Sequence, residues 1–223
     1  RNPELLDRRT GAIVFLAFAA AYFCSALVRA INATLSPVLT QDFSLHARDL
    51  GLLAGGYFLG FAAVQLPMGK WLDSYGPKRV SVCFLAVAVL GCLAFSVATS
   101  FTGLLVARIL VGVGVSACLM APMTGYRRWF DAPSQLRANS WMLMTGSLGM
   151  LASTLPVQWL LPLMGWRPLF WILAALILLA MAAIAWLAPT WQLPEKPADA
   201  QPASTYAEVW RSRYFRKLLP LAV

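Results

Sequence analysis

The sequence predicts an all-α integral membrane protein built from six transmembrane helices. Of its 223 residues, 60% are hydrophobic and 12% are charged, whereas soluble domains carry roughly 25% charged residues. The apolar residues form six long runs, each near the about 20 residues that a helix needs to cross the bilayer core. Lys and Arg gather in alternate connections between these runs, a charge pattern typical of a multi-pass membrane protein.

The predicted helices follow one another through short connections. They cover residues 11–36, 50–69, 80–99, 101–125, 138–162 and 168–188. We expect residues 1–10 to be a cytoplasmic N-terminus and residues 11–188 to form one bundle. A segment rich in Pro, Ala and polar side chains opens the predicted cytoplasmic linker, residues 189–217. Residues 218–223 have the composition of a truncated seventh helix.

The net charge of +9 reflects membrane topology, and we expect no nucleic-acid partner. Most Lys and Arg lie in the N-terminus and the even-numbered connections, whereas the opposite connections hold Arg48 and Arg167. The positive-inside rule predicts a protein of the cell (inner) membrane whose N-terminus and linker lie in the cytoplasm. Arg8 and Arg9 before an apolar run also resemble an export signal, but this run is longer and five more follow it.

The six runs differ in polarity. The third and sixth carry no ionisable residue, whereas the other four hold the polar groups. This order, polar, polar and apolar twice over, suggests two repeats of three helices. In the first run one helix face carries polar residues at spacings of 3, 4, 3 and 4, namely Tyr22, Ser25, Arg29, Asn32 and Ser36. We expect this face to line a water-filled cavity, and the alternative is a packed polar interior.

Two arginines lie well inside the predicted helices. Arg29 and Arg108 are at comparable depth, and no Asp or Glu within a run can pair with either. Because an unpaired buried charge is costly, the partner must be a carbonyl, water, further chain or a bound anion. We expect Arg29 to bind an anionic ligand and Arg108 to have a structural or gating role. Further candidate lining residues are Tyr57, Gln65 and Asn139.

Small residues and prolines predict how the helices pack. Glycines of the second, fourth and fifth runs allow close backbone approach, and Pro67, Pro122 and Pro156 predict kinks. No enzyme signature is present: the chain has one histidine, His46, and no phosphate loop. Its four cysteines lack metal-site spacing and predict small buried side chains. We therefore expect no catalytic activity, no metal and no cofactor.

Three motifs resemble those of the major facilitator superfamily. The loop after the second run matches at Gly69, Asp73, Gly76, Lys78 and Arg79, whereas Ser74 and Pro77 depart from the pattern. The fourth run resembles the family motif R-x-x-x-G-x-G through Arg108, Gly112 and Gly114. A further stretch, Gly165-Trp166-Arg167, resembles the entry to the family's sixth helix.

The resemblance implies a fold of twelve helices in two halves, each made of two inverted three-helix repeats. It implies that Asp73 and the basic loop latch the cytoplasmic side, and that Arg108 joins a coupling network. Residues 27–29 also resemble the anion-binding first helix of organophosphate:phosphate antiporters and related organic-anion carriers.

We therefore expect the N-terminal half of a secondary transporter that moves a small organic anion by rocker-switch alternating access. Its expected partners are the substrate, the lipid bilayer and a C-terminal six-helix half. Proton-coupled efflux of drugs or hydrophobic compounds is one alternative, although the family's drug-antiporter motif on the fifth helix lacks its proline here. Another alternative is a non-transporting half that self-associates.

Overall fold

The computed structural model describes residues 5–191, which form helices and no strand. Residues 1–4, the predicted linker after Trp191 and the predicted seventh helix lie outside the described residues. Within residues 5–191 the helices are α1 (Arg8–Phe43), α2 (Ala47–Ala63), α3 (Gln65–Val97), α4 (Phe101–Val115), α5 (Ala117–Trp129), α6 (Ala132–Ala152), α7 (Leu155–Met164) and α8 (Trp166–Leu187). The all-helical part of the fold prediction is therefore confirmed.

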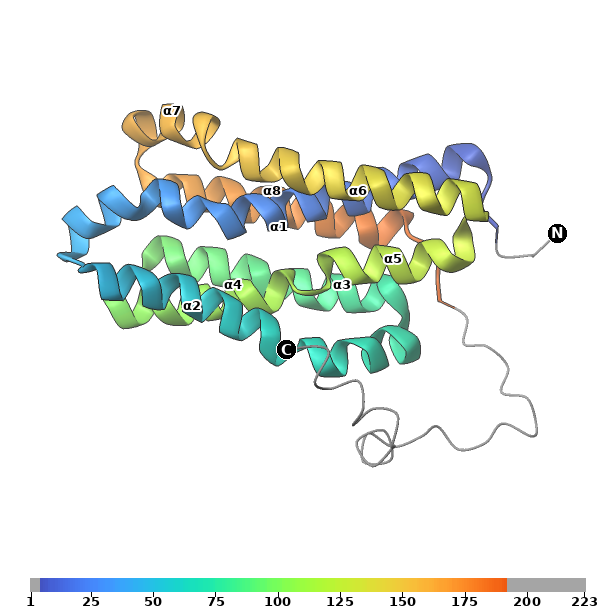
Figure 1. The fold of residues 1–223 in the computed structure, drawn as a ribbon, viewed down its shortest axis with the longest axis horizontal. Helices are drawn as coiled ribbons and strands as arrows, with labels where there is room; N and C mark the ends of the chain where they lie inside the picture. Colours follow the sequence, from blue (N-terminus) through green and yellow to red (C-terminus); the bar gives the residue numbers. More distant parts are fainter. Residues whose placement is uncertain (1–4, 192–223) are drawn as a thin grey trace, which may run out of the picture. The chain divides into compact units, whose positions relative to one another are not determined.

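Among residues 5–191, five helical segments are long and apolar enough to cross a membrane, namely Arg8–Phe43, Gln65–Val97, Phe101–Trp129, Ala132–Met164 and Trp166–Leu187. The second predicted run, residues 50–69, is divided between α2 and α3 because the helix is interrupted at Val64. Within α3, Gly76 leaves helical geometry with φ 78° and ψ 165°, and the ribbon turns back there (Figure 1). The exact number of six membrane crossings and the inverted repeats stay predictions.

The prolines that predict kinks each follow a helix interruption. Pro67 comes three residues after the break at Val64, and Pro156 comes two residues after the break that ends at Thr154. Ser116 separates α4 from α5 six residues before Pro122. A proline lacks a backbone N–H and crowds the carbonyl four residues earlier, so the helix ladder weakens in the preceding turn.

Polar side chains begin the helices at their exposed ends. The Asp7 carboxylate accepts hydrogen bonds from the backbone N–H groups of Arg9 (3.2 Å) and Thr10 (3.4 Å) at the start of α1. Hydrogen bonding, from the Thr10 hydroxyl above all, lowers the pKa of the Asp7 carboxyl because it favours the charged form. At α2 the His46 backbone N–H donates to Asp49 Oδ2 at 2.9 Å, and the His46 side chain is 88% exposed.

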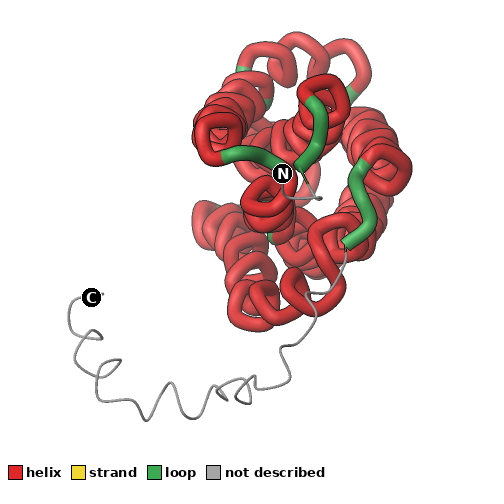
Figure 2. The backbone as a smooth tube through the Cα atoms, turned by 90° about the vertical axis from the view of Figure 1, so that its right-hand side faces the viewer, coloured by secondary structure: helices red, strands yellow, loops and turns green. Residues whose placement is uncertain are grey.

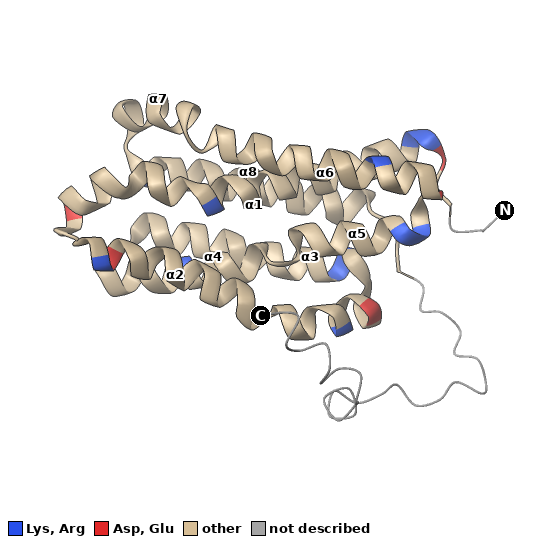
Figure 3. Ribbon diagram, viewed as in Figure 1, with Lys and Arg blue, Asp and Glu red and all other residues tan. Residues whose placement is uncertain are grey.

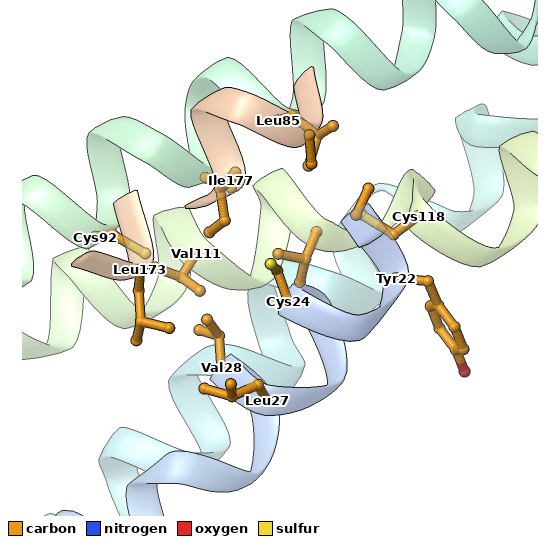
Figure 4. Packing of buried hydrophobic residues seen from close by; sticks show 14 of the residues in the cluster. Tyr22, Cys24, Leu27, Val28, Leu85, Cys92, Val111, Cys118, Leu173 and Ile177 are labelled. Carbon is orange, nitrogen blue, oxygen red and sulfur yellow. The ribbon is translucent and has the colours of Figure 1, made fainter. Parts of the chain in front are cut away.

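The helices pack as one bundle around α1 and α4. α1 lies against α6 and α8, α4 lies against α2 and α3, and α3 also packs on α8; Figure 2 shows the helices in end view. The group of α1, α6 and α8 meets the group of α2, α3 and α4 in the core. Figure 4 shows Val28 of α1, Val111 of α4 and Ile177 of α8 close to one another there. The predicted buried cysteines are buried at Cys24, Cys92 and Cys118, but Cys83 is exposed.

The exposure of the helices does not follow the polarity of the predicted runs. The α6–α7 segment, which covers the fifth predicted run, is the least buried of the five apolar segments, whereas the apolar α3 and α8 are more buried. Exposed apolar side chains on this segment include Trp141, Leu148 and Trp159. The polar composition of a run therefore does not by itself show which helix packs inside.

Glycines bring α2 and α4 into backbone contact. A Cβ at Gly60 would lie 2.3 Å from the Ile109 carbonyl oxygen, and one at Gly112 would lie 2.1 Å from the Tyr57 carbonyl oxygen. By contrast, a Cβ at Gly51 or Gly55 would meet nothing within 4 Å. The predicted packing role thus belongs to one face of α2, and the Gly51 and Gly55 face is open in residues 5–191.

Charged residues divide the bundle into two ends. Figure 3 shows most Lys and Arg at the end where α1 and α6 begin. At the opposite end, where α2 begins, an acidic Asp49 lies in the first turn. This distribution agrees with the expected basic side, while its assignment to the cytoplasm stays a prediction.

Alanine substitutions on α2 test the packing. We expect Gly60→Ala to lower the melting temperature of the detergent-solubilised protein by about 5 °C, because the added methyl group overpacks the contact with α4. Gly55→Ala, on the open face of the same helix, is the matched control and should leave the melting temperature unchanged or slightly raised. Equal effects of the two substitutions would contradict the assigned packing face.

Candidate functional site

The side chain of Tyr57 lies between the two intramembrane arginines. Arg29 Nε of α1 donates a hydrogen bond to the Tyr57 hydroxyl of α2 at 3.4 Å. The Arg108 guanidinium carbon of α4 lies 5.1 Å from the centroid of the Tyr57 ring, a distance typical of a cation–π contact. Three helices thus converge on one aromatic side chain, and both arginines contact it.

Arg108 is a buried link between α4 and α1. Its side chain is 1% exposed, and its Nη1 donates to the Val28 carbonyl oxygen at 3.1 Å. A backbone carbonyl and an aromatic face therefore take the place of a carboxylate. This environment gives Arg108 a structural position, out of reach of a ligand in solution.

Arg29 is half-buried and more accessible. Its guanidinium carbon lies 5.6 Å from the centroid of the Phe61 ring of α2, so Arg29 contacts one aromatic ring and the hydroxyl of Tyr57. Within residues 5–191 a basic side chain approaches a carboxylate within 4 Å at His46 and Asp49, 3.7 Å apart, and neither intramembrane arginine has a carboxylate partner there. The terminal nitrogens of Arg29 are available to an anion.

Packing beneath Tyr57 explains why the two arginines meet there. Gly112 lies against the Tyr57 carbonyl oxygen, where a Cβ would clash, and Gly56 lies against Leu105 of α4. Since a larger residue at Gly112 would push α4 away from α2, this glycine allows Arg108 to reach the ring of Tyr57.

The polar face predicted on α1 is only partly accessible. Tyr22 is 7% exposed and Ser25 is 1% exposed. A Cβ at Gly146 of α6 would lie 2.6 Å from the Tyr22 ring, so α6 covers this part of the face. For these two side chains the structure shows the packed-interior alternative, whereas Arg29, Asn32 and Ser36 of the same face are half-buried.

The other candidate lining residues differ in their distance from Arg29. Gln65 is half-buried at the start of α3, eight residues beyond Tyr57. Asn32 Oδ1 and Asn139 Oδ1 are buried and accept no hydrogen bond from the described residues. Tyr22 contacts Gly146, so Asn139 and Arg29 lie in opposite directions from this contact, about 20 Å apart along the helix axes at the standard rise. The structure does not bring Asn139 to the arginine pair.

The basic loop predicted as a latch packs on the end of α8. Lys78 Nζ donates to the Ala188 carbonyl oxygen at 2.9 Å, while the side chains of Asp73 and Arg79 are exposed. The Asp73 carbonyl oxygen accepts a hydrogen bond from Trp191 Nε1 at 3.3 Å. Gly69 has open space around its Cα.

Several residues of these sites were missed by sequence reasoning. Phe61 beneath Arg29, the Val28 carbonyl that binds Arg108, and Trp191 on the basic loop have no motif of their own. Their contacts join positions 32 to 118 residues apart, so no local spacing signals them. Among residues 5–191 no group of three His, Cys, Asp or Glu side chains could hold a metal ion.

The long apolar helices, the two arginines around Tyr57 and the divided charge define an α-helical multi-pass membrane protein. The sequence model of the Major Facilitator Superfamily matches residues 18–223. The chain belongs to this family, as its motifs predicted. The family and the curated relatives below are transporters and not enzymes, in agreement with the absence of an enzyme signature.

The chain is similar to two curated transporters whose names include an organic anion. The chain is 29% identical over 188 residues to the 4-hydroxybenzoate transporter PcaK of Pseudomonas aeruginosa, covering 82% of this chain and 40% of that protein. It is 27% identical over 150 residues to the hexuronate transporter of Escherichia coli, covering 67% of this chain and 35% of that protein. The chain therefore spans less than half the length of these relatives.

A solved structure shares the fold. It is a bacterial homolog of the human lysosomal transporter Spinster, in an inward-facing and unoccupied conformation. The TM-score is 0.72 at 18% sequence identity, and the match covers 96% of this chain and 50% of that one. At this identity the likeness concerns the fold alone.

The different environments of the two arginines predict different effects on stability. We expect Arg108→Ala to lower the melting temperature of the solubilised protein by about 10 °C, because it leaves a cavity beside Tyr57 and removes the link to α1. Arg29→Ala removes a more accessible side chain and should change the melting temperature far less. A larger loss from Arg29→Ala than from Arg108→Ala would contradict the structural role given to Arg108.

Proposed function

We propose that this chain forms part of a secondary active transporter for a small organic anion and that Arg29 binds the anionic group. The observation that carries the proposal is the half-buried Arg29 guanidinium, held by Tyr57 and without a carboxylate partner in residues 5–191. Because a charge in this position is costly, a bound anion offsets the cost in a way that a neutral ligand does not. The names of the hydroxybenzoate and hexuronate relatives support the same class of substrate.

The contacts of Arg29 suggest how the anion is met. Nε is engaged by the Tyr57 hydroxyl, which leaves the two terminal nitrogens to donate. Two parallel N–H donors match the two oxygens of a carboxylate. Phe61 lies beside the guanidinium, so an apolar or aromatic body of the substrate meets a ring rather than water. Asn32, Gln65 and Tyr57 are the other proposed lining residues.

The transport cycle belongs to the same proposal. The chain supplies one half of a twelve-helix protein, with six crossings in two inverted repeats, and this half rocks against a C-terminal half. The N-terminus and the basic loop lie on the cytoplasmic side of the inner membrane. The separation of charge between the two ends of the bundle supports this orientation. Exposed Asp73 on the loop is placed to latch the cytoplasmic side.

Two alternatives are less well supported. Efflux of cationic drugs would bring a positive charge to Arg29 and Arg108, which have no neutralising carboxylate in residues 5–191. A self-associating, non-transporting half would use the exposed apolar face of α6 and α7. Anion uptake by cells that express the complete reading frame would reject that case, because an inert half gives no flux in the complete protein.

Substitution of Arg29 tests the proposal. In cells that express the complete reading frame, we expect Arg29→Ala to reduce uptake of radiolabelled 4-hydroxybenzoate or galacturonate by about 30-fold or more, because the anion loses its charged partner. Arg29→Lys should restore part of the uptake, since it keeps the charge and loses the two-pronged geometry.

Arg48→Ala is the matched control, because Arg48 is an exposed arginine at the start of α2. Expression at the membrane, measured by immunoblot, must be equal for all variants. Unchanged uptake of every transported anion in Arg29→Ala would reject the assignment, whereas loss of drug resistance without loss of anion uptake would favour efflux.

A further inference from the structure

The chain continues past α8 as a short extension, residues 188–191, that packs on the basic loop. The first contact is the hydrogen bond from Lys78 Nζ to the carbonyl oxygen of Ala188 at 2.9 Å. Ala188 is the C-cap of α8, where unpaired carbonyl groups and the helix dipole attract a positive charge. The loop thus holds the end of α8 through its lysine.

The second contact is made by Trp191 at the end of the extension. Its Nε1 donates to the Asp73 carbonyl oxygen at 3.3 Å. Gly76 lies directly beneath it: a Cβ at Gly76 would be 2.2 Å from Trp191 Cβ. With φ 78°, Gly76 also has a backbone conformation that disfavours side chains. Glycine is therefore required here for the turn and for the indole that covers it.

The third contact comes from α5. The Arg128 guanidinium carbon lies 4.1 Å from the centroid of the Trp191 ring, a close cation–π distance. Arg128 is in the last turn of α5. One indole therefore contacts the turn that joins the two parts of α3 and the end of α5, while Trp191 itself lies four residues after the last residue of α8.

We propose that Trp191 is a positioning residue that fixes the Asp73–Gly76 turn to the basic end of α5 and to the end of α8. The carbonyl of Asp73 is held by the indole while its carboxylate stays exposed, so the indole sets where that carboxylate is presented. The contact also ties three helix ends into one unit, which lets the bundle move as a rigid body. The consequence for transport rests on the proposed function, whereas the structural role of Trp191 does not.

Hydrogen–deuterium exchange of the full-length protein in detergent, without substrate, tests the structural role. In Trp191→Ala we expect the peptide that covers residues 72–80 to exchange about fivefold faster, because the turn loses its cation–π and hydrogen-bonded cover. Trp191→Phe keeps a ring for Arg128 and loses the N–H, so its exchange rate should be intermediate. Should Trp191→Ala fail to fold, Trp191→Phe carries the test.

Trp186→Ala is the matched control, because Trp186 lies near the end of α8 and is 86% exposed. It should leave exchange of the turn unchanged. Gly76→Ala should reproduce the faster exchange, since the added methyl group displaces the indole. Equal exchange in the wild type, Trp191→Ala and Trp191→Phe would overturn the proposal, and so would an equal increase in Trp186→Ala.

Transport kinetics separate this inference from the proposed function. Trp191→Ala should lower the maximal uptake rate without a change in KM, because Arg29 is untouched while the cytoplasmic end of the bundle loosens. A change in KM alone would overturn the role in the transport cycle. If Arg29→Ala leaves anion uptake intact, the proposed function fails, yet the exchange result still decides the role of Trp191.

Discussion

A guanidinium inside an apolar bundle must be neutralised or well bonded, and this constraint shapes the centre of the protein. Arg108 meets it in part: its Nη1 donates to the Val28 carbonyl and its guanidinium faces the Tyr57 ring, while its buried Nε has no hydrogen-bond partner among the described residues. That solution requires α4 to lie close to both α1 and α2. Gly112 provides the closeness by leaving room for the Tyr57 carbonyl. The packing of three helices therefore depends on how one buried charge is bonded.

The same tyrosine then creates an asymmetry between the two arginines. Its ring faces buried Arg108, and its hydroxyl accepts a hydrogen bond from half-buried Arg29. Arg108 is buried in contacts between helices, whereas Arg29 keeps its terminal nitrogens available. An anion site built in this way has a fixed positive charge, held by an aromatic scaffold that loses little conformational entropy when a ligand binds. This division of roles explains why two arginines lie at the same depth without acting alike.

Much of the fold was predictable because local sequence encodes it. Hydrophobic runs indicated the apolar helices, prolines indicated the interruptions near Val64, Ser116 and Thr154, and the loop motif indicated the family. In the site, the spacing of polar residues placed Arg29 on one helix face, and the absence of carboxylates in the runs left a carbonyl, water, further chain or a bound anion as the partner. The structure realises the carbonyl option at Arg108.

Other features depend on contacts between distant segments, and periodicity does not encode them. Tyr22 is buried because α6 lies over it. Its position in the helical repeat of α1 is the same as that of the more accessible Arg29, so the repeat alone does not distinguish the two. Asn139 is polar and intramembrane, yet its place in the register separates it from Arg29. The role of Trp191 arises only when the end of α8 meets a turn more than 100 residues earlier in the chain.

The central claim, that Arg29 and not Arg108 binds the substrate anion, is tested most directly by an experimental structure of the full-length protein with a transported carboxylate bound. The account predicts the carboxylate oxygens within hydrogen-bond distance of the Arg29 terminal nitrogens, with Arg108 still bonded to the Val28 carbonyl. A carboxylate bound elsewhere, with Arg29 making no contact to it, would contradict the account.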